Sequence, residues 1–238
     1  MPRNKFNTLV SWSYSVYTQY LKCPLSVRYD KVDKVRISEP PNPYFVKGDL
    51  VHKCAQEYVS GASKTIVKDL VKQRSVLNRL RKVNTHIQVE LKWAFTRNFA
   101  LTQWYAGDAW LRMMIDVLRD QKKPPEVEII DWKTGKQYDD HKQQRSLYAL
   151  GGLQLVQIGQ LAGGSKDAKL TASHVYTDLP QPAIEVFTMK DLIPLKREWI
   201  LRIKDMMSDT EYPAKPGFAC KYCRFGKSKG GPCQAEAL

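Results

Sequence analysis

The 238-residue chain has no run of 18 apolar residues, the length that an α-helix needs to cross a lipid bilayer. We therefore expect no membrane-spanning helix and no membrane partner. Residues 1–5 are not followed by the apolar segment of a secretory signal peptide, so we expect an intracellular protein. The sequence also lacks internal repeats and long low-complexity segments.

Acidic residues are scarce in comparison with basic ones. The chain has 24 Asp and Glu against 38 Lys and Arg, which gives a formal net charge of +14. A field of this sign favours a polyanionic partner, most often nucleic acid and less often an anionic membrane surface. The hydrophobic content of 43% and the charged content of 26% are ordinary for a folded protein. The length allows one sizeable core, or a core with a small appendage.

Two segments of the first 61 residues have the apolar spacing of α-helices. The first has a possible N-cap at Ser11 or Ser13 and is expected to end at Cys23, because the next residue is a proline. The second is expected to end at Gly61, since glycine readily terminates a helix.

A third helix is predicted over residues 64–82, where seven basic residues accompany one acid. Lys64, Lys68 and Lys72 follow one another at steps of four, which places them on one face of an α-helix. Such a stripe could bind the phosphates of a nucleic acid. It could equally be a solvated helix face, which is the usual role of a charge run.

The remainder of the chain predicts an α/β (α+β) fold, in which helices flank a central mixed sheet. Five short runs rich in β-branched and aromatic residues predict strands, at 86–95, 110–118, 126–133, 173–179 and 183–189. Helices are predicted between the third and fourth runs and after the last, at 139–164 and 190–210. We expect a single domain with three parts, namely an N-terminal helical segment, a core, and a C-terminal helix with a cysteine-rich tail, over residues 1–43, 44–189 and 190–238.

Two charged residues lie in the apolar run 126–133. Residues i and i+2 of a strand share a face, so Asp131 and Lys133 point one way and Trp132 points into the core on the other side. Asp116, in the preceding strand, could approach Asp131. Two such carboxylates repel each other, and Mg2+ or Mn2+ would relieve that repulsion. Without a metal, Asp131 and Lys133 would be an ordinary ion pair at the end of a strand.

Four motifs occur in an order and at a spacing that resemble the PD-(D/E)XK nuclease superfamily, in particular its RecB-type branch. The motifs are Gly48-x-x-x-His52, Asp116, Asp131-Trp132-Lys133-Thr134-Gly135 and Gln144-x-x-x-Tyr148. The resemblance implies a restriction-endonuclease-like core and a catalytic site that hydrolyses a phosphodiester with the help of a bound metal.

Carried over residue by residue, the resemblance implies that the side chains of His52, Asp116 and Asp131 ligate Mg2+ or Mn2+, together with the carbonyl oxygen of Trp132. Asp116 and Asp131 are therefore both catalytic and metal-binding. Lys133 becomes the catalytic lysine, which would lie beside the attacking water and the scissile phosphate.

The same resemblance implies that Gln144 and Tyr148, four residues apart on one helix face, hold either the active site or the DNA backbone. The chain departs from the wider superfamily in two ways, because an Asp stands at 131 where restriction-type relatives often have Glu, and no proline precedes Asp116. The role of Glu90, in the strand before, is open between a carboxylate that lines the site and a surface ion pair.

The five cysteines are an odd number, and three of them gather near the C-terminus as C-x2-C-x9-C, at 220, 223 and 233. This pattern favours metal ligation over disulfides. With Cys23 as a fourth ligand, it resembles the iron-sulfur nucleases of the RecB branch, namely the CRISPR adaptation exonuclease of the Cas-four type and the nuclease domain of AddB. That resemblance implies a 4Fe-4S cluster on Cys23, Cys220, Cys223 and Cys233, with Zn2+ and free thiols as alternatives. Cys54 is expected to be a small buried residue, and the sequence also leaves it open as a fourth ligand.

Together these features predict a Mg2+- or Mn2+-dependent deoxyribonuclease, most simply an exonuclease acting on single strands or DNA ends. The resemblance places it in phage or CRISPR-linked recombination, repair or replication, in the cytoplasm. Possible partners besides DNA are a second copy of the chain and a recombination or CRISPR adaptation protein. Two alternatives stay open, namely a catalytically silent DNA-binding or scaffolding protein of the same fold, and a zinc-bearing RNA-binding module, which would leave the motif at 131–135 unexplained.

Overall fold

The computed structural model describes residues 8–38, 42–83 and 86–235. The chain divides into two compact units, one formed by residues 1–41 with 199–238 and the other by residues 42–198. The expected division of a single domain after residues 43 and 189 stays a prediction. The N-terminal residues used above to argue against a signal peptide lie outside the described part. No helix of the described residues is long and apolar enough to cross a membrane.

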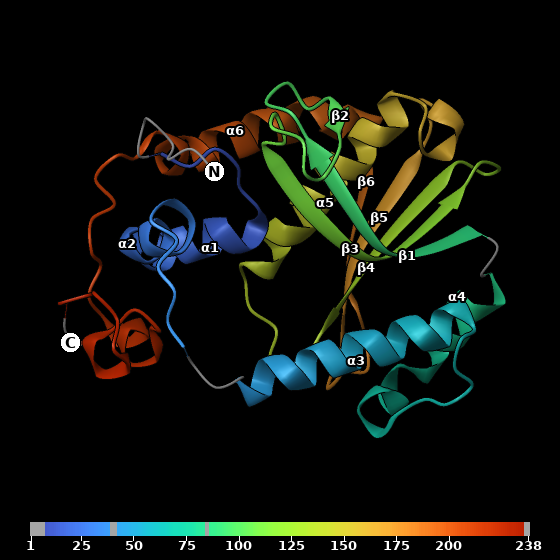
Figure 1. The fold of residues 1–238 in the computed structure, drawn as a ribbon. Coiled ribbons are helices and arrows are strands. Elements are labelled where there is room, and N and C mark those ends of the chain that lie inside the picture. The colour runs from blue at the N-terminus through green and yellow to red at the C-terminus, as the bar shows by residue number, and fades with distance from the viewer. Residues whose placement is uncertain (1–7, 39–41, 84–85, 236–238) are drawn as a thin grey trace. The chain divides into compact units, whose positions relative to one another are not determined.

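The larger unit, residues 42–198, is built on a six-stranded mixed sheet (Figure 1). The strand order is β2-β1-β3-β4-β5-β6, and every pair is antiparallel except β4 with β5. All five predicted strands are present, and the mixed sheet is confirmed. The strands are β1 (Ile87–Phe95), β2 (Leu101–Thr102), β3 (Leu111–Gln121), β4 (Glu126–Lys133), β5 (Lys169–Tyr176) and β6 (Ala183–Thr188).

Helix α3 (Pro43–Ser60) and helix α4 (Arg74–Lys82) cover one face of this sheet. Their buried side chains form one apolar cluster with Ile130 and Trp132 of β4. As expected, α3 ends at Gly61, which adopts φ +86° and terminates the helix in the left-handed region. Cys54, predicted to be a small buried residue, is only partly buried and packs against the same cluster.

Helix α5 (His141–Gln157) joins the parallel strands β4 and β5 and packs on the opposite face. Its glycines allow a close approach, because a Cβ at Gly152 would lie 2.4 Å from Leu170 Cδ1 and 3.0 Å from Ile129 Cδ1. Adjacent residues Ile129 and Ile130 therefore contact helices on opposite sides of β4. The parallel pairing of β4 and β5 requires such a crossover helix.

The prediction of one continuous helix over residues 64–82 is wrong. Residues 63–67 have no regular structure, Lys68–Gln73 form a 3-10 helix, and only the last part forms α4. A 3-10 helix has three residues per turn, so a step of four does not keep side chains on one face. Lys64, Lys68 and Lys72 therefore form no helical stripe, although all three are exposed, and Lys72 Nζ donates a hydrogen bond to the carbonyl oxygen of Asp178 at 3.1 Å.

The smaller unit joins the N-terminal helices to the C-terminal segment. Helix α1 (Tyr14–Lys22) has Ser13 as its N-cap and Cys23 as its C-cap, as the sequence predicted, and is followed by α2 (Pro24–Val27). Helix α6 (Leu192–Ser208) begins in the larger unit and continues into this one. Trp199 of α6 stacks on Trp12, with ring centroids 5.7 Å apart, and Tyr20 donates a hydrogen bond to Asp209 at 2.7 Å. Segments nearly 190 residues apart in sequence are thus packed together.

Candidate active site

The end of β4 carries the central charged pair of the larger unit. Lys133 Nζ lies 2.7 Å from Asp131 Oδ2, and Asp131 is buried with 5% of its surface exposed. Trp132 points to the other face, where it belongs to the apolar cluster. The alternation of side chains predicted from the sequence is therefore confirmed. A buried carboxylate needs a compensating charge, and Lys133 supplies it here.

Asp116 meets this pair from the neighbouring strand. Val117 of β3 is paired with Ile130 of β4, so Asp116 lies one step further along, opposite Asp131. The backbone N–H of Trp132 donates a hydrogen bond to Asp116 Oδ2 at 2.8 Å. His52, on α3, places Nδ1 3.1 Å from the same oxygen. The structure thus brings together the histidine and both carboxylates that the sequence singled out.

Burial and mutual repulsion give the two carboxylates different affinities for protons. Burial and the negative charge of Asp131 raise the pKa of Asp116 above its ordinary value. Burial alone would raise the pKa of Asp131 too, but the positive charge of Lys133 and a hydrogen bond from Tyr148 lower it. Burial tends to lower the pKa of His52, yet its contact with Asp116 raises it. Asp131 is therefore the first of the pair to ionise, and Asp116 is the one that most needs a positive partner.

Helix α5 fixes the orientation of Asp131. Gln144 Nε2 donates to the Tyr148 hydroxyl at 2.8 Å, and that hydroxyl donates to Asp131 Oδ1 at 2.6 Å. The two side chains are four residues apart and so share a helix face. Burial and the charge of Asp131 raise the pKa of Tyr148 well above its ordinary value, so its hydroxyl keeps its proton. The sequence left open whether Gln144 and Tyr148 hold the active site or the DNA backbone, and these contacts favour the first role.

Residues 11–228 match the PD-(D/E)XK nuclease superfamily. The chain belongs to the PD-(D/E)XK nuclease superfamily. Members of this superfamily are usually nucleases, they typically use divalent metals such as Mg2+, and DNA is the substrate that membership implies. No curated protein matches the chain. Among solved structures, that of SSO0001 is similar, with 15% identity over 97% of this chain and 89% of that chain and a TM-score of 0.40.

The donor atoms of this PD-(D/E)XK site have the right chemistry for Mg2+ or Mn2+. Two carboxylates, one imidazole and the backbone carbonyl of Trp132 make a set of hard oxygen donors with a single nitrogen. Burial, and after it the charge of Asp131, raises the pKa of Asp116, so a bound cation would favour its ionised form. In the described ranges 8–38, 42–83 and 86–235, however, no three His, Cys, Asp or Glu side chains converge closely enough to hold a metal ion. In this arrangement Lys133 pairs with Asp131, and His52 contacts Asp116.

The sequence left the role of Glu90 open, and the structure places its carboxylate at the site. Glu90 lies on β1 between residues paired with Val117 and Ile115, so it faces the position of Asp116. Burial and the charge of Asp116 raise its pKa, while His52 lowers it. Its φ of +54° lies in the left-handed region, which is rare for a residue other than glycine. Its side chain is exposed to solvent.

The sequence did not single out two further residues beside the site. His174, on β5, is fully buried and lies directly opposite Asp131 in the parallel register of β4 and β5. Its Nδ1 is 3.2 Å from Arg145 Nη1, and Arg145 is itself buried on α5. Burial lowers the pKa of His174 to about 3. The strand was predicted, but no pattern in the sequence could reveal which residue of β5 would pair with Asp131.

Four of the five cysteines lie in the smaller unit. Cys223 follows the 3-10 helix Phe218–Tyr222, which contains Cys220, and the N–H of Cys233 donates to the carbonyl oxygen of Phe225 at 2.9 Å. Burial raises the pKa of the Cys223 thiol, and the thiols of Cys23, Cys233 and Cys220 raise it further. Those three cysteines therefore lie within electrostatic range of Cys223. All four are free thiols in the structure. Among the described residues, no three Cys, His, Asp or Glu side chains lie close enough together to hold a metal ion.

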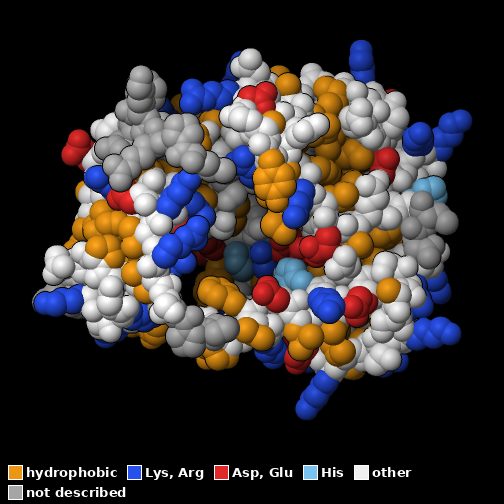
Figure 2. Space-filling model, in the orientation of Figure 1, with side chains coloured by type: hydrophobic (Ala, Val, Ile, Leu, Met, Phe, Trp, Pro, Cys, Tyr) orange, Lys and Arg blue, Asp and Glu red, His pale blue; other side chains and the backbone are white. Residues whose placement is uncertain are grey.

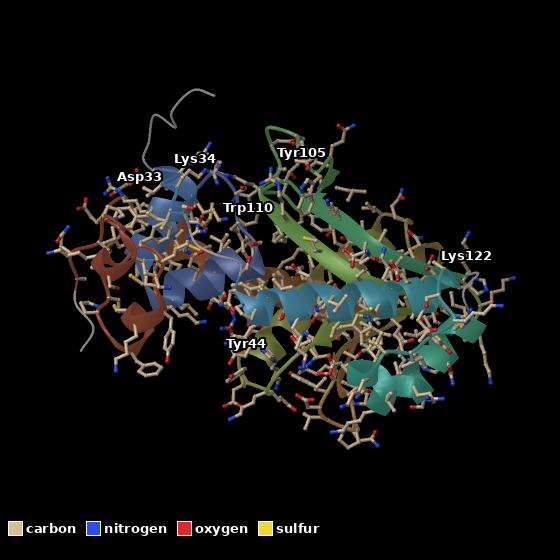
Figure 3. The ribbon with its side chains drawn as sticks, turned by 60° about the horizontal axis from the view of Figure 1, so that its bottom comes forward. Asp33, Lys34, Tyr44, Tyr105, Trp110 and Lys122 are labelled. Atoms are coloured by element: carbon tan, nitrogen blue, oxygen red, sulfur yellow. The ribbon has the colours of Figure 1, made fainter. Side chains whose placement is uncertain are left out.

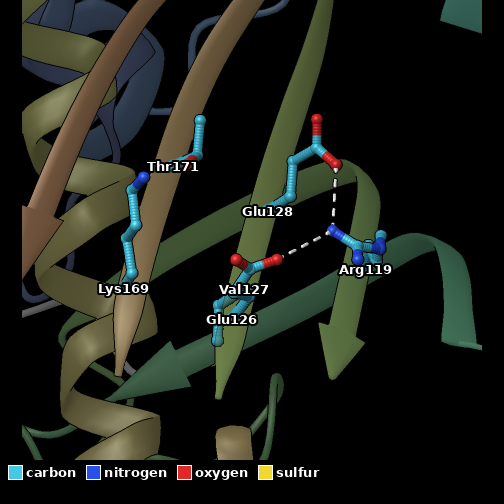
Figure 4. Close-up of a pocket in the computed structure, with 6 residues that line it drawn as sticks. All are labelled: Arg119, Glu126, Val127, Glu128, Lys169 and Thr171. Carbon is cyan, nitrogen blue, oxygen red and sulfur yellow. Dashed lines mark ion pairs between the residues drawn. The ribbon is translucent and has the colours of Figure 1, made fainter. Parts of the chain in front are cut away.

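A polar pocket lies at the opposite end of the same strands (Figure 4). Arg119 is 3.6 Å from Glu126 and 3.8 Å from Glu128, and Glu128 also pairs with Arg79 at 2.6 Å. Asp131 is five positions further along β4 than Glu126, which corresponds to about 16 Å along a strand. Since these arginines already contact carboxylates, we assign this pocket to the stability of the sheet rather than to the active site.

Proposed function

We propose that the protein is a Mg2+- or Mn2+-dependent deoxyribonuclease that hydrolyses phosphodiester bonds at a site formed by Asp116 in the middle of β3 and by the end of β4. The observation that carries this proposal is the joint orientation of Asp131 by Lys133 and Tyr148. Two side chains, Lys133 of β4 and Tyr148 of α5, hold one buried carboxylate beside a second one, Asp116. An ordinary structural ion pair would need only one of these partners.

The protein's own groups have separate roles in this proposal. A bound divalent cation would polarise the phosphate and lower the pKa of a water molecule. Asp116, Asp131 and the carbonyl oxygen of Trp132 would hold it, with His52 as a further ligand. Tyr148, supported by Gln144, keeps Asp131 in one orientation. Lys133 places a positive charge next to the reacting phosphate, where negative charge develops.

The more specific assignment within this proposal is an exonuclease of the RecB-type branch, close to the Cas-four type and the AddB nuclease domain. The Gln144-x-x-x-Tyr148 motif and the cysteine pattern support this branch. Its proposed setting is phage or CRISPR-linked DNA recombination, repair or replication, in the cytoplasm. A second copy of the chain or a recombination or CRISPR adaptation protein remains a proposed partner.

Several exposed groups are available to bind a DNA strand. Lys and Arg side chains are spread over the face shown in Figure 2, with acidic side chains between them. In the larger unit, Tyr44 at the start of α3 and Tyr105 after β2 are 84% and 88% exposed (Figure 3). Exposed aromatic rings can stack on the bases of a single strand, and lysines can bind its phosphates. Lys64, Lys68 and Lys72 are proposed as phosphate contacts on the basis of charge and exposure alone.

We also propose that Cys23, Cys220, Cys223 and Cys233 bind a 4Fe-4S cluster with a structural role, with Zn2+ as the lesser possibility. Support comes from the spacing of the cysteines, their location in one unit, and the electrostatic effect of three of them on Cys223. Hydrolysis of a phosphodiester needs no electron transfer, so a cluster there would act by joining the chain ends of that unit.

The test is cleavage of end-labelled single- and double-stranded DNA with Mg2+ or Mn2+ and, separately, with EDTA. Wild type is compared with Asp131→Asn, Lys133→Ala and the control Asp167→Asn, which makes the same change on an exposed loop. We expect wild type and the control to release nucleotides only with metal. The two site variants should lose at least about 100-fold in rate, because they remove groups that act on the reacting atoms.

DNA binding by all four proteins, without cleavage by any, would instead favour a silent DNA-binding protein of the same fold. Cleavage that persists in EDTA, or that survives in Asp131→Asn, would refute the proposed site.

A further inference from the structure

We propose that His174 is a positioning residue for Asp131, acting as the last donor of a hydrogen-bonded chain that starts at Glu185 and passes through Arg145. This series of contacts crosses four elements, from the edge strand β6 through α5 and β5 to β4. This inference rests on the metal-dependent site proposed above, because it concerns how that site holds its central carboxylate. It adds a residue that none of the four sequence motifs contains.

The outer part of the chain anchors a buried guanidinium. Arg145 Nε donates to Glu185 Oε2 at 2.9 Å, and Lys142 lies 3.8 Å from the other oxygen of the same carboxylate. Arg145 is only 6% exposed, so the position of its planar group is fixed by this ion pair and by the surrounding side chains. A fixed guanidinium can direct a hydrogen bond with a defined geometry.

The contact between Arg145 and His174 determines which ring nitrogen carries the proton. Arg145 Nη1 lies 3.2 Å from His174 Nδ1. A guanidinium has donors and no acceptor, so His174 Nδ1 must accept this hydrogen bond and cannot carry a proton. The proton of the imidazole ring is then on Nε2, and this nitrogen becomes a donor.

His174 Nε2 faces the carboxylate of Asp131. The distance to Asp131 Oδ2 is 3.8 Å, and β4 and β5 place the two residues opposite each other. Among the described residues, His174 Nε2 is a buried polar atom without a hydrogen-bond partner, whereas Asp131 Oδ2 already pairs with Lys133 Nζ at 2.7 Å. An unsatisfied buried donor is costly, and a carboxylate oxygen can accept more than one hydrogen bond, so a small shift of His174 Nε2 toward Asp131 Oδ2 would satisfy the donor.

The ring of His174 has little freedom to turn away from this position. It makes edge-to-face contacts with His141, Tyr148 and Tyr176, at centroid distances of 5.4, 6.3 and 6.2 Å. His141 is held in turn by Tyr176, whose hydroxyl lies 2.6 Å from His141 Nδ1. Tyr148 and His174 thus restrict the two oxygens of Asp131 from different sides, leaving the carboxylate oriented before any cation binds.

The first test is independent of metal and of catalysis. In metal-free protein with 15N-labelled histidine, NMR should show His174 as the neutral tautomer with the proton on Nε2. Arg145→Met, which removes the donor to Nδ1, should weaken that preference. A His174 ring protonated on Nδ1 in wild type would overturn the proposal, whatever the protein does to DNA.

The second test measures Mn2+ affinity by EPR, together with the dependence of DNA cleavage on Mn2+. His174→Leu removes the donor, His174→Gln keeps an N–H donor at the same number of bonds from Cα, and His86→Gln controls for loss of an exposed histidine. We expect His174→Leu to bind Mn2+ about 10-fold to 100-fold more weakly, with His174→Gln within about threefold of wild type and His86→Gln unchanged.

If folded His174→Leu keeps the Mn2+ affinity of wild type, or if His174→Gln is as weak as His174→Leu, the histidine acts through packing alone and the proposal fails. Should His174→Leu not fold, the comparison of His174→Gln with wild type and the tautomer measurement still decide. A wild-type protein that binds Mn2+ but cleaves no DNA would refute the proposed function and leave this inference standing.

Discussion

At the scale of single residues, the site holds two carboxylates, those of Asp116 and Asp131, close together and largely out of contact with water. Asp131 has Lys133 and Tyr148 as partners, whereas Asp116 has His52 and one backbone N–H. The difference appears in their pKa values, which are lowered for Asp131 and raised for Asp116. Asp116 is thus a residue whose ionised form opposes folding, and this is what a site prepared for a cation should contain.

Asp116→Asn should therefore stabilise the protein in EDTA at high pH while abolishing metal-dependent cleavage. A carboxyl whose folded pKa is raised costs stability when ionised, and that cost is full above the folded pKa and absent below the unfolded one. Thermal unfolding in EDTA should show the variant a few degrees more stable than wild type at pH 8, with the difference vanishing near pH 4. A variant less stable than wild type at pH 8 would contradict this account.

At the scale of elements, the sequence correctly predicted the strands that depend on the alternation and composition of side chains. It failed for features that depend on contacts between residues far apart in the chain. The five strand predictions succeeded because β-branched and aromatic residues dominate those runs, and the same alternation placed Asp131 with Lys133. Strand β2 has only two residues and no such signal. The prediction of a helix over 64–82 was wrong in its first part, where the segment Lys68–Gln73 buries Leu70 and Gln73, three residues apart, which is the period of a 3-10 helix. His174 was missed because the register of parallel strands depends on how α5 packs.

The packing of α5 leads to a prediction about Gly152. Gly152→Ala should destabilise the protein by about 1–3 kcal/mol, since the new Cβ would lie 2.4 Å from Leu170 Cδ1 in a closed core. This cost exceeds the gain of up to about 1 kcal/mol in helix propensity. Cleavage should also slow, because α5 carries Gln144 and Tyr148. Urea unfolding measures the effect, and Gly107→Ala is the control, since nothing lies within 4 Å of a Cβ there.

A Gly152→Ala protein as stable as wild type would show that Leu170 and Ile129 can move aside. In that event the distance between α5 and the sheet would not be set by this glycine, and the orientation of Tyr148 would need another explanation.

At the scale of the whole molecule, the two proposed metal sites belong to different units of the chain. The carboxylate site lies within residues 42–198, and the four cysteines of the proposed cluster lie in the unit formed by both ends of the chain. In that unit, Lys215 bonds to the carbonyl oxygen of Leu21 and Arg224 pairs with Asp30. Such polar contacts at exposed positions contribute little stability, so a covalent link through a metal cluster would add a much stronger constraint.

Loss of the proposed cluster should lower the stability of the protein before it affects the chemistry of the active site. Protein prepared without oxygen should contain about four iron atoms per chain and absorb broadly near about 400 nm, whereas Zn2+ gives no visible absorption. Cys23→Ser should lose the metal, unfold at lower temperature and be less soluble, with cleavage reduced in proportion to the unfolded fraction. Cys54→Ala, which changes a cysteine in the other unit, should keep the metal. Colourless, zinc-free wild type that is stable and active would rule out a metal-binding role for these four cysteines.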